Sequence, residues 1–203
     1  MATGKRERSS QKKKDRIIET TTRLLLKKGS LTSTTDVCHA AKLTRPTLYH
    51  YFGSKRNLLL SVHRATIERD LKPYMAEARK IGDPLERLKY MVRTHTKTMC
   101  SHPELRVLIH DTLIVKDKYF REVREEWKEH YVLLRDTIAA LKANDTIQTD
   151  VKPSWAALFV LGMITWVTYW FDYERGETVD EIANAAVQLV LNSLRQKKAI
   201  PEK

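Results

Sequence analysis

Apolar residues recur along most of the chain at the three- and four-residue spacing of α-helices. From Lys12 onward this spacing predicts a first helix, with Ile17, Leu24 and Leu25 on one face, that ends at Gly29. The same spacing returns over residues 120–141, with charged residues on the opposite face, and predicts a long amphipathic helix. No segment alternates between apolar and polar residues over a useful length. The pattern therefore predicts an all-α fold of about nine helices.

Capping signals divide the region after the first helix into short helices. Ser33, followed three residues later by Asp36, has the form of a capping box and opens a short helix. Thr44 can cap another after a break of two residues, and Pro46 in its first turn lacks an N–H that would have no intrahelical partner there. Two short helices joined by such a turn predict a helix-turn-helix.

The remaining helices are longer, and proline, glycine or Asn-Asp pairs separate them. A helix capped by Ser54 runs toward a break at Pro73. The later predicted helices run from Asp83 to about Ser101, from there to about Val115, over residues 120–141, over Pro153–Tyr173 and over Val179–Leu194.

Composition narrows the function. The chain has only 6 glycines and 6 prolines in 203 residues, and the glycines are too far apart to form a G-x-G-x-x-G or Walker A phosphate loop. Its net charge of +12 is concentrated in residues 1–56, which hold 14 Lys and Arg against 4 Asp and Glu. A basic N-terminal segment on a nearly neutral body is typical of nucleic-acid binding, although a solvated basic surface would have the same composition.

The cysteines and the most apolar segment bear on the compartment. Cys38 and Cys100 are too few for a disulfide framework, and no signal peptide opens the chain, so a cytoplasmic protein is expected. Residues 153–171 carry no charge but include proline, serine, glycine and threonine, and acidic as well as basic residues flank them. This segment is therefore interpreted as a buried or interfacial helix rather than a membrane span.

The run from Ser33 to Leu58, STTDVCHAAKLTRPTLYHYFGSKRNL, resembles the DNA-binding domain of the TetR family of transcriptional regulators. It has the family's Ser or Thr cap, its T-L-Y-x-Y-F run over Thr47–Phe52, and the following Lys55 and Leu58. Lys42 departs from the pattern, because the family commonly has a turn glycine there. The resemblance implies a disordered basic arm over residues 1–11, a helix-turn-helix domain over 12–56, and a helical ligand-binding and dimerisation domain over 57–203.

In this interpretation the second helix of the motif enters the major groove. Arg45 is expected to bind a base, since a guanidinium can donate to O6 and N7 of guanine together, and Pro46 and Thr47 suit a thymine methyl group. Lys55 is expected to bind phosphate without reading sequence. The predicted DNA-binding residues are Ser33, Thr44, Arg45, Pro46, Thr47, Tyr49, His50 and Lys55. Leu48, Tyr51 and Phe52 are interpreted as core, and His50 could equally be a surface histidine without a role.

The resemblance also implies a homodimer on palindromic operator DNA. The predicted dimer interface consists of Leu158, Leu161, Gly162, Ile182, Ala186, Leu189 and Val190, unless these residues are buried within the monomer. A small-molecule effector would release the operator, which makes the protein a repressor rather than an enzyme. No cofactor is expected.

The effector pocket is expected to be rich in aromatic side chains, although aromatic residues at helical spacing are often simply core. The predicted ligand-binding residues are Trp127, Phe159, Trp166, Tyr169, Trp170, Tyr173, Arg106 and Arg175. The stretch from Gly162 to Ala183 is also similar to that of TetR regulators that sense acyl-CoA thioesters. An acyl-CoA, with Arg106, Arg175 or Arg93 near its phosphates, is therefore the first hypothesis, and a free lipophilic or aromatic compound is the second.

Two alternatives remain open. His95, Cys100, His102 and His110 could indicate a metal-responsive regulator, but their spacing does not match a closed zinc site. A basic protein that binds DNA without sequence preference is the other alternative. No catalytic motif such as G-x-S-x-G or H-E-x-x-H is present.

Overall fold

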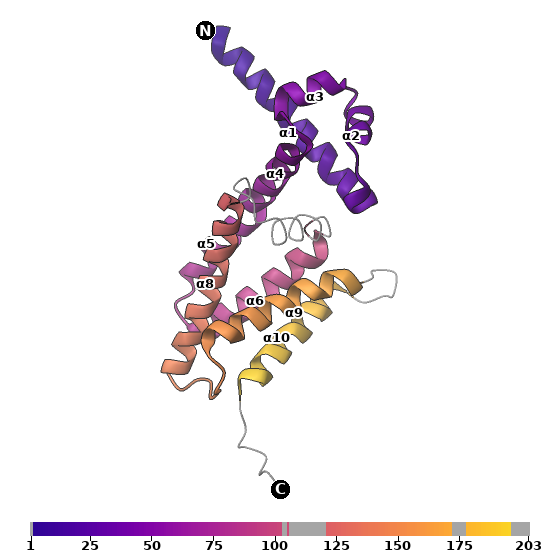
Figure 1. Cartoon of the computed structure of the whole chain (residues 1–203). Helices are drawn as coiled ribbons and strands as arrows, with labels where there is room; N and C mark the ends of the chain where they lie inside the picture. Colours follow the sequence, from indigo (N-terminus) through magenta and orange to yellow (C-terminus); the bar gives the residue numbers. More distant parts are fainter. Residues whose placement is uncertain (1, 103–104, 106–120, 172–177, 196–203) are drawn as a thin grey trace. The chain divides into compact units, whose positions relative to one another are not determined.

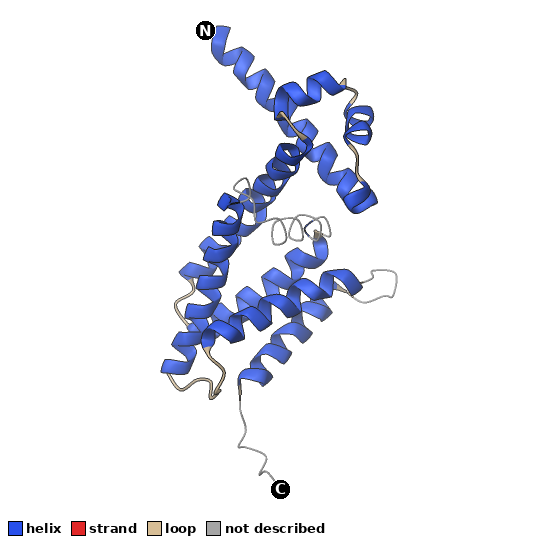
Figure 2. Ribbon diagram, in the orientation of Figure 1, coloured by secondary structure: helices blue, strands red, loops and turns tan. Residues whose placement is uncertain are grey.

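The structure is a computed structural model that describes residues 2–102, 105, 121–171 and 178–195. These residues are helical almost throughout and contain no named strand, so the predicted all-α fold is confirmed (Figure 2). The chain divides into two compact units, which are described separately: residues 1–69 with 103–124, and residues 70–102 with 125–203.

The first unit is built on four helices, coloured indigo to purple in Figure 1: α1 (Ala2–Lys28), α2 (Thr34–Ala41), α3 (Arg45–Phe52) and α4 (Lys55–Thr66). A 3-10 turn, Gly29–Leu31, follows α1, and Gly29 has the positive φ of +55° expected at a helix stop. One apolar core joins the helices, and it consists of Ile17, Val37, Cys38, Ala41, Leu48, Phe52 and Leu58.

Two predictions for the N-terminal region differ from the structure. The expected disordered arm is wrong for residues 2–11, because α1 begins at Ala2. This segment is rich in Lys, Arg, Glu and Gln, which favour helix, and Gly4 is its only weak helix former. The domain boundary expected after residue 56 falls inside α4, whose Leu58 belongs to the core of the first unit.

Local capping works as predicted. The Ser33 side chain accepts a hydrogen bond from the Asp36 amide, and Asp36 accepts one in return from the Ser33 amide, which completes a capping box. Thr44 and Ser54 cap α3 and α4 by accepting from the amides of residues three positions later. Each of these bonds spans three residues, so it forms wherever the helix begins, whatever the distant packing.

The break expected at Pro73 is replaced by a change of helix type. A π-helical turn, Ile67–Leu71, follows α4, and Pro73 then lies in the first turn of α5 (Lys72–Lys80). The wider turn re-registers the backbone hydrogen bonds just before a residue that has no N–H to donate.

The second unit is organised around α6 (Pro84–Ser101), which packs against α5, α9 (Pro153–Trp170) and α10 (Val179–Leu194). The long amphipathic helix is α8 (Arg121–Ala143). Asp83 and Thr178 cap α6 and α10 through their side chains. The core includes Leu88, Met91, Val92, Met99, Ile138 and Ile164, each 1% exposed or less.

The helix boundaries of this unit follow the prediction closely. The structure places α10 over the predicted residues and ends α9 at Trp170, three residues earlier than expected. The short helix predicted to end near Val115 lies outside the described residues. Within the described part of the chain, no helix is both long and apolar enough to cross a lipid bilayer.

Candidate DNA-binding and effector sites

The turn between α2 and α3 closes without glycine. Lys42 adopts the left-handed conformation, with φ 54° and ψ 52°, and its amide donates to the His39 carbonyl at 3.2 Å. The next amide, of Leu43, donates to the Cys38 carbonyl at 3.0 Å. These two bonds satisfy carbonyls at the end of α2, so a non-glycine residue is held in a conformation that costs it about 1 kcal/mol.

The two faces of α3 have different exposure. Leu48 and Phe52 are buried in the core and Tyr51 packs against it, as predicted. The opposite face is exposed and carries the predicted groove-side residues Arg45, Pro46, Thr47, Tyr49 and His50. One short helix therefore anchors itself by one side and presents a continuous polar and aromatic surface on the other. A recognition helix needs this division.

Arg45 is held in place from the neighbouring helix. Its Nη2 atom donates to Thr35 Oγ1 at 2.6 Å, and both side chains are exposed. A guanidinium has five N–H donors, so this bond restricts the side chain and leaves donors for a base. The sequence analysis missed Thr35. Its position in the first turn of α2, beside the predicted recognition helix, was the only available signal.

Ser33 and Asp36 are occupied with each other. Ser33 Oγ donates to Asp36 Oδ2 at 2.6 Å, and Lys28 Nζ lies 2.6 Å from Asp36 Oδ1, which ties the end of α1 to the start of α2. The hydrogen bond from Lys28, then those from Ser33, hold the pKa of the Asp36 carboxyl well below its usual range. The serine hydroxyl predicted to bind DNA therefore already serves the capping box.

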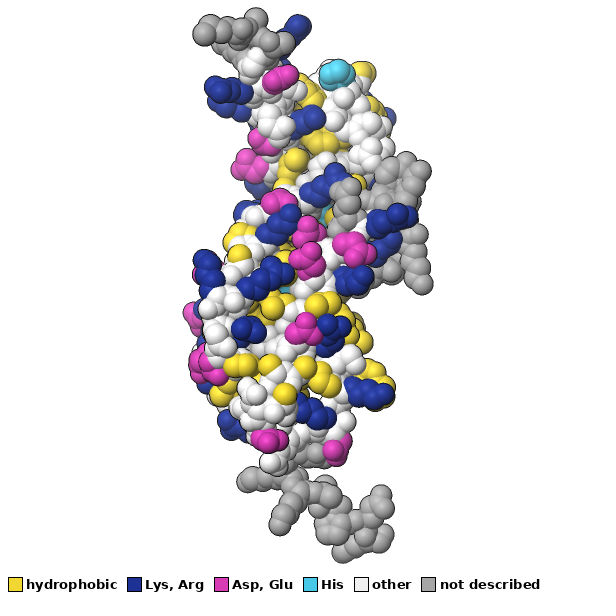
Figure 3. All heavy atoms as spheres, turned by 90° about the vertical axis from the view of Figure 1, so that its left-hand side faces the viewer, with side chains coloured by type: hydrophobic (Ala, Val, Ile, Leu, Met, Phe, Trp, Pro, Cys, Tyr) yellow, Lys and Arg dark blue, Asp and Glu magenta, His cyan; other side chains and the backbone are white. Residues whose placement is uncertain are grey.

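Thr44 and Lys55 flank the recognition helix. The Thr44 and Thr47 hydroxyl oxygens lie 2.9 Å apart, and the Thr47 amide donates to Thr44 at 3.4 Å. Lys55 is exposed at the first position of α4, next to the capping Ser54. A helix N-terminus with an exposed lysine suits a phosphate group. On the face drawn in Figure 3, basic side chains occur on both units, with acidic side chains among them.

Arg45→Ala and Lys55→Ala are expected to weaken DNA binding in different ways. Loss of a guanidinium that contacts a base should cost about 1–3 kcal/mol on the preferred sequence and relax one position. Lys55→Ala should weaken preferred and scrambled DNA alike and reduce the slope of log affinity against log salt by about 0.9. Fluorescence anisotropy on both duplexes at several salt concentrations measures these effects, with Lys142→Ala in the second unit as the control. An unchanged ratio between the two duplexes in Arg45→Ala would remove Arg45 from base recognition.

The predicted aromatic pocket is not assembled among the described residues. Phe159, Trp166 and Tyr169 are 72%, 61% and 44% exposed on α9, and the Trp166 and Tyr169 rings lie 5.5 Å apart. Trp127 lies elsewhere, on α8 beside His95 and His130. The three α9 residues share a face of the helix that does not pack into the core. The Trp170 side chain, Tyr173, Arg106 and Arg175 lie outside the described parts of the structure.

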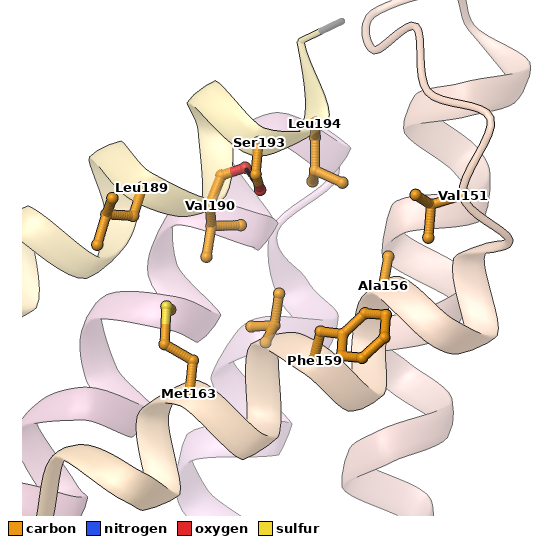
Figure 4. A pocket seen from close by; sticks show the side chains of 9 residues that line it. Val151, Ala156, Phe159, Met163, Leu189, Val190, Ser193 and Leu194 are labelled. Carbon is orange, nitrogen blue, oxygen red and sulfur yellow. Dashed lines mark hydrogen bonds between the residues drawn. The ribbon is translucent and has the colours of Figure 1, made fainter.

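An open apolar groove of about 380 Å³ lies between α9 and α10 (Figure 4). Phe159 and Met163 reach it from α9, and Leu189 and Val190 reach it from α10. The residues predicted for a dimer interface fall into three groups. Leu158, Gly162 and Leu189 are exposed, Leu161 and Ile182 are half-buried, and Ala186 and Val190 are buried within the monomer.

A buried polar cluster in the second unit was not predicted. Tyr74 of α5, His95 of α6 and His130 of α8 are 6%, 4% and 1% exposed. The Tyr74 hydroxyl lies 2.9 Å from His130 Nε2, and the two histidine rings are 4.7 Å apart between centroids. Burial lowers the pKa of His95 to about 4, and burial followed by the neighbouring His95 lowers that of His130 as well. Both imidazoles are therefore neutral at pH 7.

The sequence contains a weak signal for this cluster. His95 lies four residues from both Met91 and Met99, and His130 lies four residues before Leu134, so each histidine belongs to an apolar helical face. For the metal alternative, the described residues contain no group of three His, Cys, Asp or Glu side chains that could hold an ion. Burial raises the pKa of the Cys100 thiol to about 11, which disfavours the thiolate that a metal requires.

Comparison with known proteins matches both parts of the chain. Residues 17–62 match the family model "Bacterial regulatory proteins, tetR family", and residues 82–194 match "Tetracyclin repressor-like, C-terminal domain". Comparison with curated proteins yields no match.

Solved structures show the same fold. A TetR/AcrR-family regulator from Thermobifida fusca has 27% identity and a TM-score of 0.72, covering 90% of this chain and 98% of its own. AibR in complex with isovaleryl coenzyme A and operator DNA has 22% identity and a TM-score of 0.79, covering 87% and 97%. FadR from Bacillus subtilis in complex with stearoyl-CoA has 16% identity and a TM-score of 0.70, covering 89% and 98%. With its exposed recognition helix, its helical C-terminal unit and family-model matches over more than half its length, the chain belongs to the TetR family of DNA-binding transcriptional regulators.

Proposed function

We propose that the protein is a homodimeric repressor that leaves a palindromic operator when an acyl-CoA thioester binds its second unit. The observation that carries the dimer is an exposed apolar stripe along α9. Trp155, Phe159, Trp166 and Tyr169 are each 44% exposed or more, and Gly162 lies on the same line. Steps of four, three, four and three residues keep all five on one face of the helix.

The stripe fits a second copy of the same helix pair. Leu189 on α10 is 61% exposed and borders the groove shared with α9, so both helices contribute apolar surface. A Cβ added to Gly162 would meet no atom within 4 Å, so packing within the described monomer does not require glycine there. A glycine on an exposed stripe allows another helix to approach closely. A self-complementary surface of this kind suits a two-fold dimer, which places two recognition helices on a palindrome.

The effector class rests on the interior of the second unit. The small cavity around the buried cluster is lined by Tyr74, His95, His130 and apolar side chains, with no charged residue among them. Such a cavity suits an uncharged acyl group and disfavours the carboxylate of a free acid. AibR and FadR of Bacillus subtilis, which share the fold, are described in complex with acyl-CoA thioesters. Arg93 is bonded to Asn184 Oδ1 at 3.2 Å, which leaves the source of charge for the CoA phosphates among the residues predicted earlier.

Isovaleryl-CoA or stearoyl-CoA is expected to release the protein from DNA, because effector binding to the free form competes with operator binding. The preferred duplex is first selected from a random pool with the purified full-length protein. Fluorescence anisotropy then follows release by each thioester, with isovalerate, stearate and free coenzyme A as matched controls. Release by the thioesters alone supports the proposal. Equal release by the acids would point to a lipophilic effector, and no release by any probe would exclude this effector class.

A further inference from the structure

One buried polar atom in the second unit has no hydrogen-bond partner in the described structure. His130 is 1% exposed, and its Nδ1 is the only buried side-chain nitrogen or oxygen among the described residues in that state. Leaving such a group unpaired costs about 1–3 kcal/mol. Burial of this kind is uncommon in native structures and is frequent where a ligand completes the bonding.

The proton of the Tyr74 hydroxyl decides the chemistry of that atom. The hydroxyl lies 2.9 Å from His130 Nε2, within the ordinary range, but 3.4 Å from the Met91 carbonyl oxygen, which is long for an O–H donor. Tyr74 therefore donates to Nε2. Because a neutral imidazole carries one proton, that proton is on Nδ1, so the unpaired atom is a donor.

His130 lines a crevice that four helices share. Its walls are formed by Tyr74 of α5, His95 of α6, Leu134 of α8 and Ile164 of α9, among others. The crevice encloses about 150 Å³ of empty volume but is too narrow for a water-sized sphere in this conformation. A cavity of roughly this volume holds a six-carbon ring when its shape allows. An occupant must therefore widen the gap between helices.

We propose that His130 Nδ1–H binds the carbonyl oxygen of the effector, while a short apolar group of about four to six carbons fills the crevice. This inference rests on the proposed effector-responsive function and names the atom that recognises the effector. The crevice offers one donor and apolar walls, so an uncharged ketone or thioester fits it. A hydrocarbon leaves the donor unpaired, and a carboxylate loses its hydration without gaining a cation. Because an occupant pushes apart α5, α6, α8 and α9, binding is coupled to helix movement.

Two substitutions at one position separate the two bonds of the imidazole. His130→Asn keeps an amide donor near Nδ1 but loses the contact with Tyr74, whereas His130→Gln keeps a group near Nε2 and loses the donor. The full-length wild type and both variants are titrated with 4-methyl-2-pentanone, 2-methylpentane and isovaleryl-CoA. Binding is followed by calorimetry, and the ¹⁵N shifts of labelled histidine report the tautomer. Melting temperatures without ligand check that both variants fold.

The expected result is an Nδ1-protonated His130 whose signal shifts with the ketone, and binding of the ketone about tenfold or more weaker in His130→Gln than in His130→Asn. An Nε2-protonated tautomer, equal binding of ketone and hydrocarbon, or an unshifted His130 would overturn the inference. Operator release by isovaleryl-CoA from wild type and His130→Gln alike would leave the proposed function standing and remove this role of His130. Ketone binding at His130 without operator release by the thioester would do the reverse.

Discussion

Phe159→Glu is expected to convert the dimer into monomers and to weaken operator binding by about 100-fold or more. Phe159 is 72% exposed in the monomer and lies at the centre of the α9 stripe. In the proposed dimer the new carboxylate would be buried without a partner, which is strongly unfavourable. Each monomer would then bind one half-site alone and lose the effective concentration that linkage supplies.

Sedimentation velocity at micromolar concentration measures the dimer, and anisotropy measures operator affinity. Leu189→Glu, on the facing helix, should have the same effect because it borders the same groove. Leu31→Glu is the control for oligomeric state, since Leu31 is 83% exposed but lies in the first unit. If Phe159→Glu sediments as a dimer, the interface lies elsewhere. If the wild type is already a monomer, the dimer proposal is wrong.

Acidification from pH 7 to pH 5 is expected to destabilise both units by several kcal/mol in total. Burial lowers the pKa of His63 in the first unit and of His95 in the second to about 4, from an ordinary value of 6.5. The folded state therefore binds fewer protons than the unfolded state, and stability is lost as pH falls from about 6.5 toward 4. At about 1.4 kcal/mol per pH unit, each histidine costs roughly 2 kcal/mol at pH 5.

Urea unfolding at pH 7, 6 and 5 measures this loss. His95→Gln, which cannot titrate, should reduce the dependence of the free energy of unfolding on pH by about one proton. Asp36 and Glu181 do not confuse the result. Hydrogen bonds lower the pKa of each, so their contribution is lost only as pH falls below the ordinary carboxyl range. A free energy of unfolding that stays constant between pH 7 and 5 would show that these histidines are accessible to protons.

The DNA-binding site was largely predictable because its determinants are local. Ser33, Thr44 and Ser54 each cap a helix through a bond that spans three residues, and Leu48 and Phe52 are four residues apart on one helical face. Once these positions are known, the exposed face of α3 follows from the 3.6-residue repeat. The bond from Arg45 to Thr35 joins two helices across the turn, so it could not be derived from either helix alone.

The effector unit was less predictable because its determinants are distant in sequence. Periodicity identified α9 as an apolar helix, but a helix apolar around most of its circumference does not indicate which side faces the core. Phe159, Trp166 and Tyr169 were therefore expected in a pocket and are exposed instead. Similarly, the domain boundary could not be predicted at residue 56, because Leu58 joins the first core through contacts with other helices.

By itself the sequence determined the helices, their caps, the basic N-terminal segment and the reading face of α3, since each depends on interactions within a few residues. The tertiary structure alone decided that Tyr74 meets His130, 56 residues away, and that His95 packs beside them. It also decided that α9 and α10 both pack on α6 and leave an apolar groove open between them. These features depend on which helical faces pack together, and that choice is a property of the whole core rather than of any one segment.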